Sequence, residues 1–161
     1  MADTDRELTS GERAIVAQVF GTAIDVAPVR IRCAKYFILQ PRNVVMAPNG
    51  DIWFHPAGTL WRDDFAAEPL HLRALLVHEL VHVWQHQSGI CLPLRRPPFA
   101  RYRYRLKPGK RFTSYGLEQQ ARIVEHAYLL AEGGSAPATA ACYAAVLPFA
   151  TAISGRSPLT S

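Results

Sequence analysis

The chain has 161 residues, of which 49% are hydrophobic, and its formal net charge is +5. This length fits one domain with a sizeable core, and the hydrophobic fraction excludes an intrinsically disordered chain. No run approaches the roughly 20 apolar residues of a membrane span, and the first residues lack the pattern of a secretory signal. We therefore expect a single domain over residues 1–161, cytoplasmic by default, with loose termini at 1–7 and 154–161.

The segments before residue 60 predict one helix and a small sheet. Residues 8–20 carry an apolar stripe at helical spacing. Residues 29–33 alternate apolar and basic side chains, as a half-buried strand does. Residues 43–47 and 51–55 flank an Asn-Gly pair, which is a strong signal for a β-hairpin. The sequence therefore predicts an α+β domain with a small antiparallel sheet ahead of the next helix.

Residues 70–87 predict a long helix that contains the sequence His78-Glu79-Leu80-Val81-His82. Two histidines four positions apart lie on one face of a helix, so both imidazoles can reach a single metal ion, and Glu79 points near that ion. This pattern is typical of zinc metallopeptidases, in which the metal activates a water molecule and the glutamate is the general base. The alternative is a structural histidine pair, which the apolar neighbours disfavour because buried polar groups without partners cost free energy.

A third metal ligand must come from the chain beyond this motif. The acidic residues there are Glu118, Glu125 and Glu132, and the histidines are His86 and His126. His86 is excluded because eight helical positions separate it from His78 by about 12 Å, whereas zinc bonds to nitrogen are about 2 Å long. Residues 117–131 predict a second helix with Glu118 in its first turn, where it can be laid across the first helix. Glu125, on nearly the same face, is the alternative ligand or an acceptor for a ligand histidine's N–H.

Residues 95–111 hold eight lysines and arginines and no acid. Within them, residues 101–106 alternate arginine with apolar side chains, which predicts a strand with Tyr102 and Tyr104 facing the core. Basic residues between tyrosines also suit nucleic acid, through phosphate neutralisation and base stacking. We favour the half-buried strand, because no nucleic-acid-binding signature accompanies the segment, while an anionic partner surface remains open. Beyond it, residues 138–149 predict a short packing helix.

Several stretches carry a resemblance to known families. The histidine motif followed by Glu118-Gln119-Gln120-Ala121 is similar to the gluzincins, in which two helix histidines and a downstream helix glutamate hold zinc. More closely, the chain resembles a family of small proteobacterial proteins described as Vgr-related, a name that links them to type VI secretion spike proteins. The matching stretches are Val44-Val45-Met46-Ala47-Pro48, Phe54-His55-Pro56, Leu60-Trp61-Arg62-Asp63-Asp64-Phe65, residues 78–85, Leu92-Pro93-Leu94-Arg95-Arg96 and the Glu-Gln-Gln-Ala segment.

The gluzincin resemblance implies a zincin-like, mainly helical α+β domain that holds one zinc ion. The implied metal ligands are His78, His82 and Glu118, with Glu79 as general base. Thermolysin-like gluzincins carry an aspartate four residues after the ligand glutamate, where this chain has Arg122. Either Glu125 or a backbone carbonyl orients the histidine in this chain, or the site is tuned differently from that of thermolysin-like gluzincins.

Together these features predict a zinc metallopeptidase that cleaves peptide bonds in a peptide or protein substrate. A tyrosine or histidine is expected to steady the oxyanion, with Tyr115 as the first choice and Tyr128 and His126 as alternatives. The competing function is a non-catalytic, zincin-like adaptor or accessory of a type VI secretion apparatus. The Vgr-related resemblance implies a secretion-apparatus partner and export by that system, and nucleic acid is disfavoured as a partner.

Overall fold

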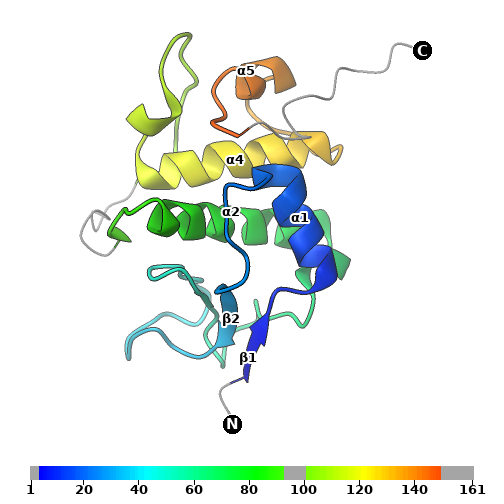
Figure 1. The fold of residues 1–161 in the computed structure, drawn as a ribbon, viewed down its shortest axis with the longest axis vertical. Helices are drawn as coiled ribbons and strands as arrows, with labels where there is room; N and C mark the ends of the chain where they lie inside the picture. Colours follow the sequence, from blue (N-terminus) through cyan, green and yellow to red (C-terminus); the bar gives the residue numbers. More distant parts are fainter. Residues whose placement is uncertain (1–3, 93–100, 150–161) are drawn as a thin grey trace.

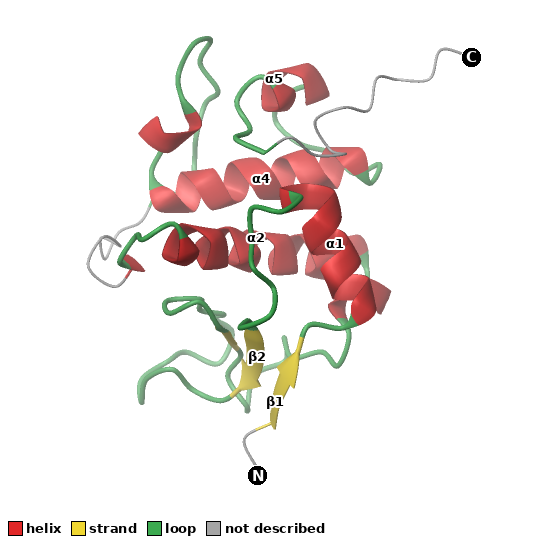
Figure 2. Ribbon diagram, viewed as in Figure 1, coloured by secondary structure: helices red, strands yellow, loops and turns green. Residues whose placement is uncertain are grey.

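The computed structural model describes residues 4–92 and 101–149, and within them the chain is an α+β structure with four α-helices and one three-stranded sheet. The elements, in chain order, are β1 (Thr4–Glu7), α1 (Ser10–Phe20), β2 (Arg30–Cys33), β3 (Ile52–Trp53), the 3-10 turn η1 (Phe65–Ala67), α2 (Leu70–Gln87), the 3-10 turn η2 (Phe112–Ser114), α4 (Leu117–Ala131) and α5 (Ala140–Ala144). Helices dominate, and the short strands gather at one end of the molecule (Figure 2).

α2 is the centre of the fold. α4 runs alongside one face of it, the sheet lies beyond its opposite face, and α1 crosses it (Figure 1). Eleven of its 18 residues are buried. The aliphatic residues of α2 that have no exposed surface are Leu76, Val77, Leu80, Val81 and Val83. Because this helix is covered on most sides, the histidines and the glutamate of its motif lie inside the molecule.

The two long helices have the bounds that the sequence predicts, Leu70–Gln87 and Leu117–Ala131. Gly89 follows the end of α2 at Gln87 and the cap residue Ser88, and its φ of 85° is a backbone conformation that glycine adopts readily and other residues rarely do. Gly116 is the N-cap residue before α4, and its N–H donates to Oε1 of Gln119 at 3.0 Å. Neither these helices nor any other helix in the described part of the chain is both long and apolar enough to cross a bilayer.

α1 begins at Ser10, two residues later than predicted, because Thr9 caps it. Oγ1 of Thr9 accepts from the backbone N–H of Glu12 at 3.1 Å, and the Glu12 carboxylate accepts from the Thr9 N–H at 2.9 Å. This reciprocal pair is a capping box. Glu12 is fully buried and also accepts from the Arg6 guanidinium and the Phe65 N–H, each at 2.8 Å. One carboxylate therefore joins β1, α1 and η1.

The sheet is mixed, so the prediction of an antiparallel sheet was wrong in part. β2 pairs antiparallel with β1 and parallel with β3. The hairpin predicted across residues 43–55 is reduced to a single antiparallel bridge between Met46 and Trp53. Asp51 accepts a hydrogen bond from Nε of Arg32 at 2.7 Å, which holds the start of β3 beside β2 instead.

The N-terminal segment is ordered where a loose terminus was expected, because Thr4–Glu7 forms β1. Its backbone pairs with β2, and two side chains secure it: Asp5 forms an ion pair with Arg32, and Arg6 forms one with Glu12. The edge of β2, with which this segment pairs, is contributed by residues 30–33, well beyond the reach of a local pattern, so local pattern does not predict this strand. The other terminus expected to be loose, 154–161, lies outside the described residues.

Two predicted elements in the C-terminal half differ from the structure. Residues 101–106 form no strand, and Tyr102 is 46% exposed, although Tyr104 packs against the core as predicted. A side chain of α4 takes the place of a neighbouring strand, since Nε2 of Gln119 donates to the Arg103 carbonyl at 2.7 Å. The helix predicted over residues 138–149 is shortened to Ala140–Ala144, because the chain ahead of Pro148 disfavours helix.

Candidate metal centre

Three side chains from α2 and α4 meet in the interface between these helices. His78 and His82 come from consecutive turns of α2, and their ring centroids are 5.2 Å apart. Glu118 comes from the first turn of α4, and its Oε2 lies 3.2 Å from Nε2 of His78 and 3.3 Å from Nε2 of His82. One ligand atom from each residue lies within 4.8 Å of the others, and all three residues are buried. The structure therefore brings together the three residues predicted as metal ligands.

The separations of these atoms fit a tetrahedral zinc site. Ligand atoms about 2 Å from a tetrahedrally bound ion lie roughly 3.3 Å from one another, and the Glu118 oxygen lies at about this distance from both imidazole nitrogens. Nε2 of His82 is buried and has no hydrogen-bond partner within residues 4–92 and 101–149. Such an atom is unfavourable unless a water or an ion satisfies it. Two imidazoles and one carboxylate are also a known donor set of catalytic zinc sites.

Glu125 contacts His78 on the side of the ring opposite Glu118. Its Oε2 lies 2.9 Å from Nδ1 of His78, and its Oε1 accepts from Nη1 of Arg122 at 2.7 Å. An ionised carboxylate only accepts hydrogen bonds, so Nδ1 carries a proton and Nε2 faces Glu118. Of the two roles that the sequence left open for Glu125, the structure places it as the hydrogen-bond acceptor for a histidine. Arg122, which departs from the thermolysin-like pattern, holds this carboxylate in place.

The two carboxylates change the protonation of His78 in the metal-free chain. Burial disfavours the charged ring, but hydrogen bonds to Glu118 and Glu125 outweigh it and raise the pKa of His78 from 6.5 to about 9. Burial opposes ionisation of Glu125 as well, yet the hydrogen bond to His78 and the charge of Arg122 lower the pKa of Glu125. His78 is therefore protonated at neutral pH in the metal-free chain.

A chain of amides fixes the orientation of His82. Nε2 of Gln85 donates to the Leu117 carbonyl at 3.1 Å and to Oε1 of Gln120 at 2.9 Å. Nε2 of Gln120 in turn donates to the Tyr115 carbonyl at 2.9 Å. With its NH₂ group engaged, Gln85 has only Oε1 left for Nδ1 of His82, 2.8 Å away, and that oxygen accepts. The proton of His82 therefore sits on Nδ1, which leaves the Nε2 lone pair facing Glu118.

Glu79 lies beside this group and keeps one oxygen unengaged. Its side chain is buried, and Oε2 has no hydrogen-bond partner in the described part of the chain. Its negative charge contributes to the raised pKa of His78, as expected of a carboxylate close to that ring. Such an oxygen can accept a proton from a water molecule in the site.

Each of the three residues predicted to steady an oxyanion has a polar side-chain atom engaged in another contact. The Tyr115 hydroxyl contacts the backbone at 105 and 107, at 3.4 and 3.1 Å. The Tyr128 hydroxyl accepts from Arg73 at 3.3 Å. Nδ1 of His126 lies 2.6 Å from the Tyr104 hydroxyl. A different tyrosine, Tyr102, approaches the candidate metal centre.

Tyr102 lies over His78, with ring centroids 6.4 Å apart and an interplanar angle of 28°. The residue is 46% exposed. The sequence places it in a basic, tyrosine-containing segment, but the alternation of that segment predicts a core position for this ring. Its position over His78 depends on how the segment packs on α4, which local pattern does not reveal.

Two pockets flank the candidate metal centre. The first, about 150 Å³, is on the side of His82 and Glu118 and is almost entirely apolar. The second, about 340 Å³, is on the side of Tyr102 and has two arginines and a histidine in its lining. Its lining side chains are Tyr102, Arg103, Tyr104, Arg122, His126 and Pro137. His86, which the sequence excluded as a ligand, is exposed. Another histidine, His55, has its Nδ1 engaged by the Ala57 N–H.

No family model matches the chain. Over 138 residues it is 39% identical to the type VI secretion system spike protein VgrG2b of Pseudomonas aeruginosa, and the match covers 80% of this chain and 13% of the spike protein. A solved structure of the effector domain of P. aeruginosa VgrG2b is 37% identical, with a TM-score of 0.70. That match covers 80% of this chain and 75% of the solved chain.

The fold and the site together define a small α+β domain with a candidate metal centre between two packed helices. At this identity and coverage, the chain belongs to the family of the VgrG2b effector domain. It is therefore a Vgr-related type VI secretion protein, as the resemblance of its sequence stretches implied. The chain spans about one eighth of the length of the spike protein that it matches.

Proposed function

We propose that this domain is a zinc-dependent metallopeptidase with a gluzincin-like site. The observation that carries the proposal is the contact of one Glu118 oxygen with Nε2 of both His78 and His82. Among the described residues the group offers three protein ligands, which leaves one position of a tetrahedral ion for water or substrate. Four protein ligands would indicate a structural site, so this donor count favours hydrolysis.

The residues around the group have distinct tasks in this proposal. Zinc, when bound, supplies a Lewis acid that lowers the pKa of water and polarises a carbonyl. Glu79 takes the proton of the attacking water and passes it to the leaving amine as the peptide bond breaks. Glu125 and Gln85 accept the Nδ1 protons of the two histidines, so that both rings present Nε2 lone pairs to the same point.

The hydrolytic proposal is tested by replacing Glu79 with Gln and measuring zinc content and cleavage of a mixed peptide pool. We expect the variant to keep its zinc and to lose at least about 100-fold in cleavage rate, because general-base catalysis is typically worth that much or more. Glu68→Gln, which changes a partly exposed glutamate, is the matched control and keeps wild-type activity. A zinc-loaded wild type that cleaves no peptide or protein would instead support the non-catalytic adaptor.

Tyr102 is the residue that we assign to the oxyanion in place of Tyr115. Its ring lies over that of His78 and the residue is 46% exposed, whereas the Tyr115 hydroxyl is engaged by backbone. Removal of one oxyanion donor typically costs about 100-fold or more in kcat. Tyr102→Phe is therefore expected to lower kcat with little change in KM, and Tyr115→Phe is the comparison. A larger loss of kcat in Tyr115→Phe than in Tyr102→Phe would reverse the assignment.

We further propose that the domain is exported by a type VI secretion system and that its partner in export is a component of that apparatus. The support is its relation to a domain of a spike protein and to the solved effector domain. Export is tested by following the tagged chain in the medium of cells with an active or an inactivated apparatus. Equal amounts in both media would contradict it.

A further inference from the structure

The apolar pocket beside the candidate metal centre has a position and a lining that suit one kind of ligand group. His82 and Glu118 form part of its wall, so anything that fills it lies next to the proposed reacting atoms. The rest of the wall is contributed by apolar and aromatic side chains, principally Tyr36, Phe37, Met46, Leu92 and Leu117. A polar group that enters this pocket loses water without gaining comparable hydrogen bonds, which is unfavourable.

The size of the pocket selects among apolar groups. Its volume is about 150 Å³, and apolar cavities of about that size bind a benzene ring. A phenylalanine or leucine side chain therefore fills it. Glycine or alanine leaves most of it empty, which forfeits the contacts that a filled pocket provides.

The outer wall of the pocket is held in place by a buried glutamine. Gln40 is 3% exposed; its Oε1 accepts from the Tyr36 N–H at 2.8 Å and its Nε2 donates to the Val44 carbonyl at 2.9 Å. The Tyr36 ring also packs edge-on against Trp53, with centroids 5.5 Å apart. The wall is therefore formed before any ligand binds, which lowers the entropic cost of binding.

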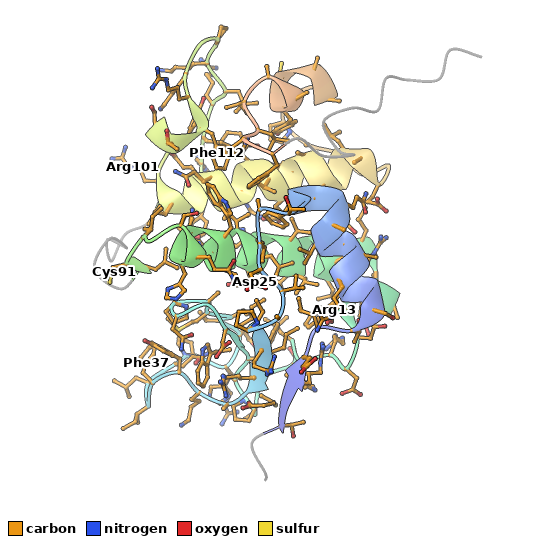
Figure 3. All side chains as sticks on the ribbon, viewed as in Figure 1. Arg13, Asp25, Phe37, Cys91, Arg101 and Phe112 are labelled. Atoms are coloured by element: carbon orange, nitrogen blue, oxygen red, sulfur yellow. The ribbon has the colours of Figure 1, made fainter. Side chains whose placement is uncertain are left out.

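The rim of the pocket is apolar as well. Phe37 is 44% exposed, and Ile38 and Leu39, which follow it, are 85% and 81% exposed. Phe37 lies on the loop between β2 and β3, on the same side of the molecule as Cys91, just past the end of α2 (Figure 3). Phe37 lines the pocket and Ile38 does not, so the two residues form a matched pair for mutation.

We propose that this pocket binds a large apolar side chain of the substrate, so that the domain cleaves peptide bonds adjacent to phenylalanine or leucine. The inference rests on the proposed peptidase function and adds the substrate class. Phe37 and Met46 are the residues that determine this preference, because they form apolar wall outside the proposed metal ligands.

The binding step is tested without turnover, with the zinc-loaded Glu79→Gln chain labelled with ¹³C at its methionine methyl groups. The chain has two methionines, so Met46 reports on the pocket and Met1 is an internal reference. A blocked tetrapeptide acetyl-Ala-Ala-Phe-Ala-amide is expected to shift the Met46 methyl signal, while the same peptide with Gly in place of Phe shifts it at least about tenfold less at equal concentration. Phe37→Asp abolishes the shift, and Ile38→Asp retains it. Equal shifts with both peptides, or equal loss in both variants, would overturn the pocket assignment.

Hydrolysis of the same peptide pair by the active, zinc-loaded chain separates this inference from the proposed function. We expect kcat/KM to be at least about tenfold higher for the phenylalanine peptide and this ratio to fall in Phe37→Asp. Hydrolysis without preference, and without a Met46 shift, contradicts the pocket while the peptidase stands. If the Met46 signal shifts in a way that requires Phe37 but no peptide is hydrolysed, the proposed peptidase function is contradicted. The pocket is then still shown to bind apolar side chains. A Met46 methyl signal that moves with protein concentration in the absence of peptide would show that the apolar rim mediates self-association, and this result would overturn the proposal.

Discussion

The two histidines of the candidate metal centre are oriented by chemically different partners. Glu125 is charged and raises the pKa of His78, whereas Gln85 is neutral and fixes only the tautomer of His82. In the metal-free chain His78 therefore carries a positive charge between two carboxylates, and that charge takes the place of a cation. Metal binding must remove its proton, so zinc affinity is expected to rise with pH up to about 9.

The raised pKa of His78 makes the stability of the metal-free chain depend on pH. A folded-state pKa of about 9 lies above the unfolded value of 6.5, so the stabilisation is fully present below pH 6.5 and is lost as pH rises through 9. Urea denaturation with a chelator present is expected to show a loss of a few kcal/mol over this window. His78→Gln removes the pH dependence. An equal loss over this window in His78→Gln would show that another group causes it.

Gln85 supports the metal centre without touching the proposed ion. Gln85→Ala removes the acceptor for Nδ1 of His82 and is expected to weaken zinc binding about 10- to 100-fold, the usual effect of losing a hydrogen-bond partner of a metal ligand. Competition with a chromophoric chelator measures this change. Gln87→Ala, on an exposed turn of the same helix, is the control and binds zinc as the wild type does. The same affinity in both variants would contradict a role for Gln85.

Among the secondary-structure elements, the bounds of the long helices are predicted by the local sequence pattern, whereas the pairing of the strands is not. The bounds of α2 and α4 agree with prediction because helical periodicity and end signals lie within each segment. The partners of β2 come from residues 4–7 and 52–53, which are separated by most of the N-terminal half. The Asn-Gly signal at 49–50 correctly indicates a turn, but Asp51 directs the strand after it to β2.

The residues of the candidate site also fall into two groups: those that local sequence predicts and those that depend on contacts between elements. The spacing of His78 and His82 is set by one helix and is therefore visible in the sequence. Glu118, which contacts both histidines, is one of the three acidic residues downstream of the motif. Composition alone did not distinguish it from Glu125 as the third ligand. Gln85 and Tyr102 escaped prediction because their roles depend on contacts across α2, α4 and the 101–106 segment.

Glu12 links β1, α1 and η1. Replacing it therefore tests whether its contacts hold the N-terminal segment in place. It has no exposed surface, caps α1, pairs with Arg6 and accepts from the Phe65 N–H. Glu12→Ala leaves the largely buried Arg6 guanidinium without its carboxylate partner and the Phe65 N–H without its acceptor, and it is expected to lower the free energy of unfolding by about 3–5 kcal/mol. Glu7→Ala removes a 61% exposed carboxylate and is the control, with a loss of less than about 1 kcal/mol. Urea denaturation of both variants measures the difference, and equal losses would contradict the account of β1.

At the scale of the whole molecule, the candidate metal centre lies where the two long helices pack, with an apolar pocket on one side and a basic pocket on the other. α2 supplies the histidines and the proposed base, and α4 supplies the carboxylates that complete and orient the group. An extended peptide that crosses the centre would place an apolar side chain in one pocket and meet arginines in the other. The fold therefore positions the candidate metal centre, and under the proposed peptidase function its two pockets supply a basis for substrate selection.

The central claim is that His78, His82 and Glu118 hold a single zinc ion. Native mass spectrometry of the zinc-loaded chain after removal of excess metal measures this directly. We expect one zinc per wild-type chain, one per chain in the control Glu132→Ala, and none in Glu118→Ala, whose site has lost one of its three ligands. One tightly held zinc in Glu118→Ala, or none in the wild type, would contradict the account.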